Sequence, residues 1–140
     1  MSVVGCAGET FVEALALRPA LQEKYITFLK AIESTESVPQ RVFVLCRARI
    51  AQIHGQDTQG VTTDEKKILK SQRHEMLGSE AKIALVIAEK IPFQHHLIDD
   101  VEVETAKVAF GEDGCVSLLS ALAFFDVTCR LNAAISGDAN

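Results

Sequence analysis

The chain has 140 residues, the length of one ordinary domain and too short for two domains with separate cores, so we expect a single domain over residues 1–140. Hydrophobic residues make up 48% and charged residues 24%, a balance that excludes a disordered or collagen-like chain. Acidic residues outnumber basic ones by 19 to 14, and no basic block could neutralise phosphates, so no nucleic-acid partner is expected.

The cellular compartment is predicted from the N-terminus, the apolar runs and the cysteines. Met1 to Cys6 lack the basic start and apolar core of a secretory signal. The longest apolar run, Val116–Phe125, is about half the length that crosses a bilayer. Four cysteines, no two within three residues of each other, stand at Cys6, Cys46, Cys115 and Cys129. We therefore expect a cytoplasmic protein with reduced thiols and no membrane partner.

The N-terminal part of the chain predicts two helices. A short helix is expected around Thr10–Leu17. A longer helix is expected to begin at Pro19, because apolar residues recur with helical spacing at Leu21, Tyr25, Phe28, Leu29 and Ile32. The polar string over residues 33–37 breaks this pattern and marks the end of the helix.

The next helix is predicted from Pro39 to His54, with Ser37 as its N-cap. Its apolar residues share one face, and they are Phe43, Cys46, Ile50 and Ile53. Gly55 is expected to stop it, because glycine readily adopts the left-handed conformation that follows many helices. The polar stretch over residues 56–61 is predicted to be a loop.

Two further helices are predicted in the middle of the chain. Thr62 and Glu65 have the spacing of a capping box, which predicts a polar helix from Asp64 to about Glu75. After Ser79, the segment Ala81–Ile91 is apolar almost all round, which is typical of a helix buried in a core or at a subunit interface.

The C-terminal part begins with an ambiguous segment, Val101–Phe110. Alternating apolar residues favour a strand, whereas the apolar spacing and the preceding Asp99-Asp100 pair favour a helix stopped by Gly111. We predict the helix, because the chain offers no partner strand. A last long helix is expected from about Gly114 to Ala134, capped by Asp113.

The composition and the elements together predict an all-α fold. Aromatic residues make up only 6% and tryptophan is absent, which suits helix-on-helix packing better than a β-sandwich. We expect a compact helical bundle of five to seven helices.

Two stretches together carry a family resemblance. The first is Arg47–Gly55, Arg-Ala-Arg-Ile-Ala-Gln-Ile-His-Gly, and the second is Phe124–Asn132, Phe-Phe-Asp-Val-Thr-Cys-Arg-Leu-Asn. With Ala81–Lys90 between them, in the same order over roughly residues 15 to 135, the chain resembles the carboxymuconolactone decarboxylase family and its alkylhydroperoxidase D-like branch. The resemblance implies an all-helical protomer of that type, assembled with copies of itself as a homotrimer or hexamer.

The same resemblance implies a peroxidase relay, Glu-x11-Cys-x2-Cys-x3-His, in which a thiolate attacks peroxide and the Glu and His move protons. Placed here without gaps, the relay falls on Val44, Gln56, Gln59 and Thr63. None of the four can do that chemistry, and no cysteine lies between Cys46 and Cys115. The decarboxylase branch fits no better, because its site histidine also falls on Thr63. We expect a degenerate active site without a dithiol peroxidase centre and without a cofactor.

The candidate ligand-binding residues lie around this vacated position, and they are His54, Gln56, Gln59 and Arg49. His54 is the one weak catalytic candidate; it is either a general base or an imidazole stabilised by the negative end of its helix. Arg47, Arg49 and Arg130 either frame an anionic ligand or form salt bridges.

The other reactive side chains have structural interpretations. Cys46, Cys115 and Cys129 are expected to be inert core thiols, and Cys6 is the candidate for an accessible one. His95 and His96 make a poor metal pair without a third ligand, and His74 could supply one only through tertiary proximity, so no metal site is expected. Asp99 and Asp100 fit helix capping better than acid–base catalysis.

Two functions from different classes follow. The first is a homo-oligomer that binds a small molecule or a partner in the pocket implied by the resemblance. The second is an enzyme with a replaced site near His54 and an arginine, acting on a hydroperoxide, a lactone or a related metabolite. Subunit contacts are expected from the two most apolar helices, Ala81–Ile91 and Val116–Phe125, because two such helices are hard to hide in one small bundle.

Overall fold

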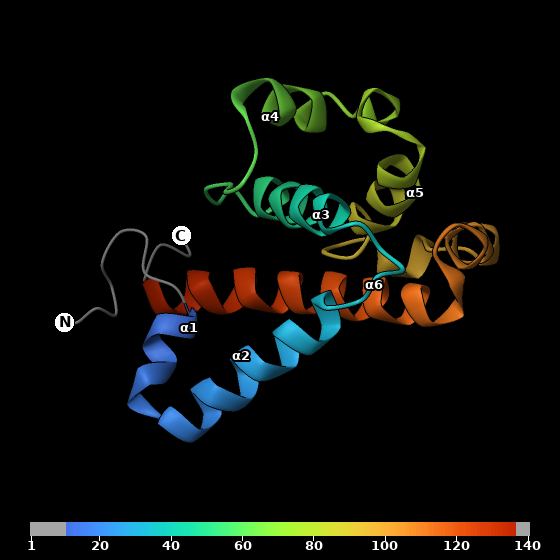
Figure 1. The fold of residues 1–140 in the computed structure, drawn as a ribbon. Helices are drawn as coiled ribbons and strands as arrows, with labels where there is room; N and C mark the ends of the chain where they lie inside the picture. Colours follow the sequence, from blue (N-terminus) through green and yellow to red (C-terminus); the bar gives the residue numbers. More distant parts are fainter. Residues whose placement is uncertain (1–10, 137–140) are drawn as a thin grey trace.

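Every regular element in residues 11–136, the part of the chain that the computed structural model describes, is helical (Figure 1). This confirms the predicted all-α class. Three short 3₁₀ helices cover Leu15–Leu17, His74–Leu77 and His95–Leu97. The α-helices are α1 Phe11–Ala14, α2 Pro19–Glu33, α3 Gln40–Ile53, α4 Thr63–Lys70, α5 Ser79–Ala88 and α6 Asp100–Ser136.

Helices α3, α5 and α6 enclose the core. Their facing apolar side chains are almost fully buried, and the largest are Phe43, Ile50, Leu85, Ile87, Leu118 and Leu122. The core-facing side of α5 is covered by α3 and α6 inside one chain, where Leu85 is 0% exposed. Ile83 and Val86 on the same helix stay partly exposed, and a subunit contact of α5 stays a prediction.

Helix α3 ends as predicted but begins differently. Gly55 has a φ of +72°, and the N–H groups of Gly55 and Gln56 donate to the carbonyls of Gln52 and Ala51 over 3.0 and 2.8 Å. These two bonds form a Schellman motif, which closes the helix end. Ser37 is not the N-cap: it precedes an extended residue 39, and its hydroxyl donates to Asp113 on α6.

The predicted capping box at α4 is confirmed, but the helix is shorter than expected. Thr62 Oγ1 accepts from the N–H of Glu65 over 3.1 Å, and the Glu65 carboxylate accepts from the N–H of Thr62 over 2.8 Å. The helix ends at Lys70 instead of near Glu75. The Ser71 hydroxyl bonds back to the carbonyl of Lys67, and the next residue adopts a positive φ that no helix can continue.

Helix α6 resolves the ambiguous segment in favour of a helix. Asp99 caps it, because its carboxylate accepts from the N–H of Glu102 over 2.8 Å. Gly111 interrupts it with a φ of 79° and a ψ of 165°, which confirms the predicted stop. The helix resumes directly after Gly111, so Asp113 lies in the first turn of the second half and is not its cap.

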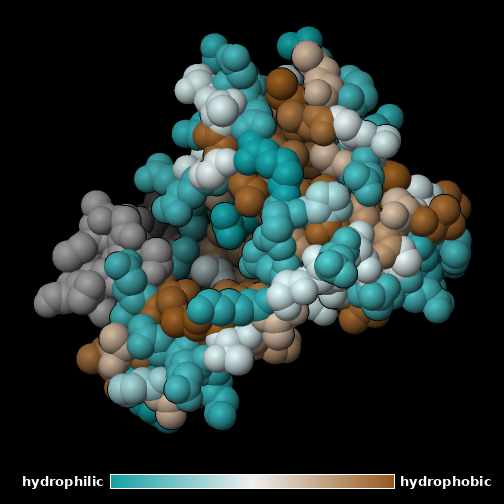
Figure 2. All heavy atoms as spheres, viewed as in Figure 1, coloured by the Kyte–Doolittle hydropathy of each residue, from teal (hydrophilic) through white to brown (hydrophobic). Residues whose placement is uncertain are grey.

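Helices α1 and α2 form an arm on the opposite side of α6 from α3, α4 and α5 (Figure 1). Tyr25 and Phe28 on α2 pack against Phe124 of α6, with ring centroids 6.3 and 4.9 Å away. The arm diverges from α3, and Figure 2 shows the surface hollowed between the two. The predicted apolar stripe of α2 is only partly covered, since Leu21 and Phe28 stay 47% and 46% exposed.

By length and composition, one helix of the described chain, spanning 100–135, is able to cross a membrane. This is weak evidence, because the same helix packs against α2, α3 and α5, and core helices of soluble proteins meet the same criterion.

Candidate functional site

His54 caps the C-terminal end of α3 and is held by α6. Its Nε2 lies 2.6 Å from Asp126 Oδ1, and the other oxygen of Asp126 accepts from Arg130 Nε over 3.0 Å. Arg130 also donates to the carbonyl of Pro92, and the Phe93 ring lies 5.3 Å from the His54 ring and 5.1 Å from the Arg130 guanidinium. With its side chain 9% exposed, His54 ties α3 to α6 and presents little surface to a ligand.

Arg49 is also committed to a partner within the protein. Its Nε lies 2.6 Å from Oε2 of Glu89, the residue that caps the C-terminal end of α5, and its terminal nitrogen donates to Gln52 over 3.1 Å. Buried His74 approaches the same Glu89 oxygen to 3.0 Å, although neither ring nitrogen makes a hydrogen bond among the described residues. The side chains of Arg49 and Glu89 are 11% and 17% exposed, so this contact joins α3 to α5 inside the fold.

A cavity of about 260 Å³ opens on the opposite side of α3. The C-terminal half of α3, the loop over residues 56–59, α1, α2 and the end of α6 all contribute to its wall. Its apolar lining comes from Val12, Leu29, Ala48, Ala51, Phe125 and Cys129. Its polar lining comes from Glu33, Arg47, Gln56, Asp57, Gln59, Thr128 and Asn132.

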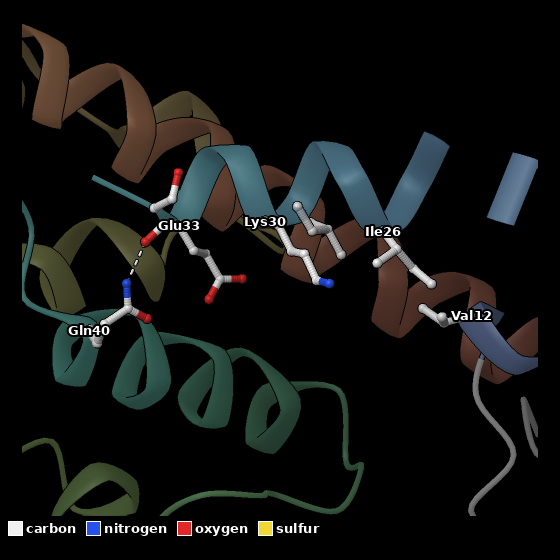
Figure 3. A pocket seen from close by; sticks show the side chains of 7 residues that line it. Val12, Ile26, Lys30, Glu33 and Gln40 are labelled. Atoms are coloured by element: carbon white, nitrogen blue, oxygen red, sulfur yellow. Dashed lines mark hydrogen bonds between the residues drawn. The ribbon is translucent and has the colours of Figure 1, made fainter. Parts of the chain in front are cut away.

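A wider groove of about 500 Å³ continues from this cavity along α2 (Figure 3). Val12, Leu29 and Glu33 line both spaces, which makes them contiguous. In the groove, Gln40 donates to the backbone carbonyl of Glu33, and the Lys30 side chain points into the open space. The groove is the more open of the two spaces and more polar side chains line the smaller cavity, so that cavity is the stronger candidate site.

The structure brings together only half of the predicted ligand-binding residues. Gln56 and Gln59 line the cavity, whereas His54 and Arg49 do not. Of the other two relay positions, Val44 packs against Gly60: a Cβ added at Gly60 would lie only 2.9 Å from the Val44 side chain. Thr63 is exposed at the start of α4. Neither Val44 nor Thr63 lines the cavity with Gln56 and Gln59.

Sequence reasoning missed several residues of these sites. Arg130 was a candidate for a salt bridge, but its partner Asp126 was not named, although their i, i+4 spacing is that of a helical ion pair. Glu33 and Asn132 both line the cavity although they are far apart along the chain, and no local pattern marks either one. Asp57 looked like an ordinary loop residue.

The described cysteines are buried and free, and burial raises the pKa of each thiol. For Cys129, which lines the cavity, burial and the nearby Asp126 raise the pKa to about 11. A raised pKa disfavours the thiolate that peroxidase chemistry needs. Cys6 lies outside the described residues. Within residues 11–136, no three histidine, cysteine or carboxylate side chains converge as metal ligands would.

Comparison with known proteins identifies no relative: no family model, no curated protein and no solved structure matches the chain. The resemblance to the carboxymuconolactone decarboxylase family therefore remains a prediction from sequence, and the function has to be argued from the geometry of the cavity.

Proposed function

We propose that this protein binds a small molecule in the cavity between α2, α3 and α6, and that it has no dithiol peroxidase activity. The observation that carries the proposal is the mixed lining of that cavity: apolar side chains from four helices, together with amide and charged side chains from α2, α3, α6 and the loop after α3. Binding sites for small ligands typically combine an apolar surface with a few polar groups that fix orientation.

Binding is favoured over catalysis at a replaced site because the catalytic candidate is used elsewhere. One ring nitrogen of His54 is hydrogen-bonded to Asp126, and the side chain is largely buried and does not line the cavity. A general base must reach the proton that it removes, directly or through one water. The thiol in the cavity wall, Cys129, is kept protonated by burial.

The proposal includes a cytoplasmic location and self-association as the homotrimer or hexamer that the family resemblance implies. Helix α2 supports self-association, because Leu21 and Phe28 are about half exposed and lie two turns apart on the same side of the helix. Light scattering on a sizing column at low micromolar concentration tests it. A stable species near the 15.2 kDa mass of one chain would refute self-association without affecting the binding proposal.

The binding proposal is tested by a fragment screen with ligand-observed NMR. Fragments should bind the wild type and lose binding in Ala51→Leu, which fills the cavity from α3. Ala123→Leu is the matched control, because Ala123 is exposed on α6 and lies outside the cavity lining. Equal binding to wild type and Ala51→Leu would overturn the proposal.

A second measurement covers the case in which Ala51→Leu does not fold. Bound fragments should shift the side-chain amide signals of Gln56, Gln59 and Asn132 in the wild-type protein, because all three line the cavity. Shifts confined to amides elsewhere, such as Gln22 or Gln94, would contradict the assignment of the site.

A further inference from the structure

The arginines of α3 differ in whether the protein provides them with a carboxylate. Arg41 and Arg49 each form an ion pair, with a glutamate from α4 and from α5 respectively. Arg47 lies with its guanidinium 5.8 Å from the centre of the Phe125 ring and forms no ion pair within the described part of the chain. Since Arg47 lines the cavity, its charge is available to a ligand.

Two carboxylates that line the same cavity are also unpaired. Asp57 follows α3 and Glu33 ends α2, and neither side chain forms an ion pair or hydrogen bond with a residue that the structure describes. The bond from Gln40 to Glu33 uses the backbone carbonyl and leaves the Glu33 carboxylate unengaged (Figure 3). The cavity thus holds one positive and two negative groups that do not neutralise one another.

The uncharged polar side chains of the cavity still offer both a hydrogen-bond acceptor and a hydrogen-bond donor. Gln56 donates its amide to the carbonyl of Cys129 over 2.6 Å, which leaves its side-chain oxygen as an acceptor. Asn132 accepts from the N–H of Phe11 over 2.6 Å, which leaves its side-chain amide as a donor. A ligand that only accepts or only donates hydrogen bonds would leave one of them unused.

We propose that the ligand is a small zwitterion of the amino-acid class, with a carboxylate and an ammonium group on a short apolar body. This inference rests on the proposed function and names the ligand of the same cavity. The carboxylate binds Arg47, the ammonium group binds Asp57 and Glu33, and the apolar body contacts Leu29 and Ala51. Arginine is well suited to a carboxylate because its planar donors match the two oxygens.

Ligands of a single charge fit this lining less well. An anion without an ammonium group would be placed beside two carboxylates, and a cation without a carboxylate would be placed beside Arg47. Like charges that line one cavity repel. The volume of about 260 Å³ also limits the ligand to a small molecule.

The experiment compares three sets of probes by calorimetry on the full chain. The first set is leucine, valine, methionine and proline; the second is the same molecules without the amino group; the third is the same molecules without the carboxylate. We expect at least one amino acid to bind tenfold or more tightly than both of its single-charge analogues. Equal or tighter binding of an analogue would overturn the zwitterion class.

Two charge variants test the assigned roles. Arg47→Gln should weaken binding of the amino acid and the carboxylate analogue about tenfold and should not weaken binding of the amine, from which it removes a like charge. Asp57→Asn should weaken binding of the amino acid and the amine and should not weaken binding of the carboxylate analogue. Arg73→Gln is the control, because Arg73 is exposed and outside the lining. Loss of amino-acid binding in Arg73→Gln, or none in Arg47→Gln, would overturn the assignment.

The outcomes separate this inference from the proposed function. If fragments bind in the cavity and are lost in Ala51→Leu, while no amino acid binds, the cavity is a binding site for another class of ligand and the zwitterion inference is wrong. If neither fragments nor amino acids bind, the proposed function itself fails.

Discussion

The two sides of α3 give an arginine different surroundings. Towards α5, Arg49 finds Glu89 in a closely packed interface, where both side chains are largely buried. Towards the α1–α2 arm, Arg47 lies over the ring of Phe125 and lines the cavity, and it forms no ion pair with a carboxylate of the described residues. The difference shows that one helix packs against the core on one side and forms the wall of a cavity on the other, according to how closely its neighbour packs.

The largest effect is expected in the core on the α5 side. Leu85→Ala should lower the free energy of unfolding by about 2 to 5 kcal/mol, because Leu85 is fully buried and its removal leaves a cavity. Urea unfolding measures it. Leu29→Ala, in the half-buried wall of the site, is the matched variant and should have a clearly smaller effect. Similar losses in both would show that the two sides are packed alike.

Breaking the charged contact between α3 and α5 should have the next largest effect. Glu89→Gln should lower the free energy of unfolding by about 3 kcal/mol, because it leaves the mostly buried Arg49 without its counter-charge. Glu65→Gln is the control: its partner Arg41 is 45% exposed, glutamine preserves the capping box, and the loss should stay below about 1 kcal/mol. Equal losses would contradict the expected difference between the largely buried ion pair of Arg49 and the more exposed ion pair of Arg41.

The thiol in the cavity wall predicts a dependence on alkaline pH. Burial raises the pKa of Cys129 from 9.0 to about 11, so the unfolded chain loses this proton at a lower pH than the native protein. The resulting stabilisation is complete below pH 9 and is lost as the pH rises towards 11. The difference in unfolding free energy between wild type and Cys129→Ala should therefore shrink over this range. A constant difference would show that the thiol is not protected from ionisation.

The smallest effect on stability is expected at Arg47. Arg47→Gln should change the free energy of unfolding by no more than about 0.5 kcal/mol, because the side chain is exposed and has no ion pair in the described structure. Thermal unfolding measures it. A loss comparable to that of Glu89→Gln would mean that Arg47 is part of the scaffold, and would remove the main argument for a ligand carboxylate.

Local signals predicted most of the fold. The C-terminal stop at Gly55, the capping box of Thr62 and Glu65, the cap at Asp99 and the break at Gly111 all depend on residues within a few positions of one another. Such signals report hydrogen bonds that a short segment makes with itself, so they are readable before the fold is known.

Tertiary partners were not predictable in the same way. Ser37 was expected to cap α3, but it bonds to a side chain on α6 that lies 76 positions further along the chain. Arg49 was expected either near a ligand or in a salt bridge; it forms the salt bridge, and its partner Glu89, 40 positions away, was not predictable from a local pattern. The segment with Gln56 and Gln59 was predicted from sequence as a loop next to the candidate site, and both residues line the cavity. Which arginine of α3 stays without a carboxylate depends on how closely α2 and α5 approach α3.

The hydrogen bond between Phe11 and Asn132 has a consequence for biosynthesis. It joins positions 121 residues apart, and Val12 and Asn132 both line the cavity. Closing a loop of this length costs conformational entropy, which the contacts that α1 makes with α6 have to offset. During translation, the α3–α5 scaffold is made first, whereas the binding cavity cannot be completed until the last turns of α6 have been synthesised. A nascent chain that still lacks residue 132 is therefore expected to lack the complete cavity.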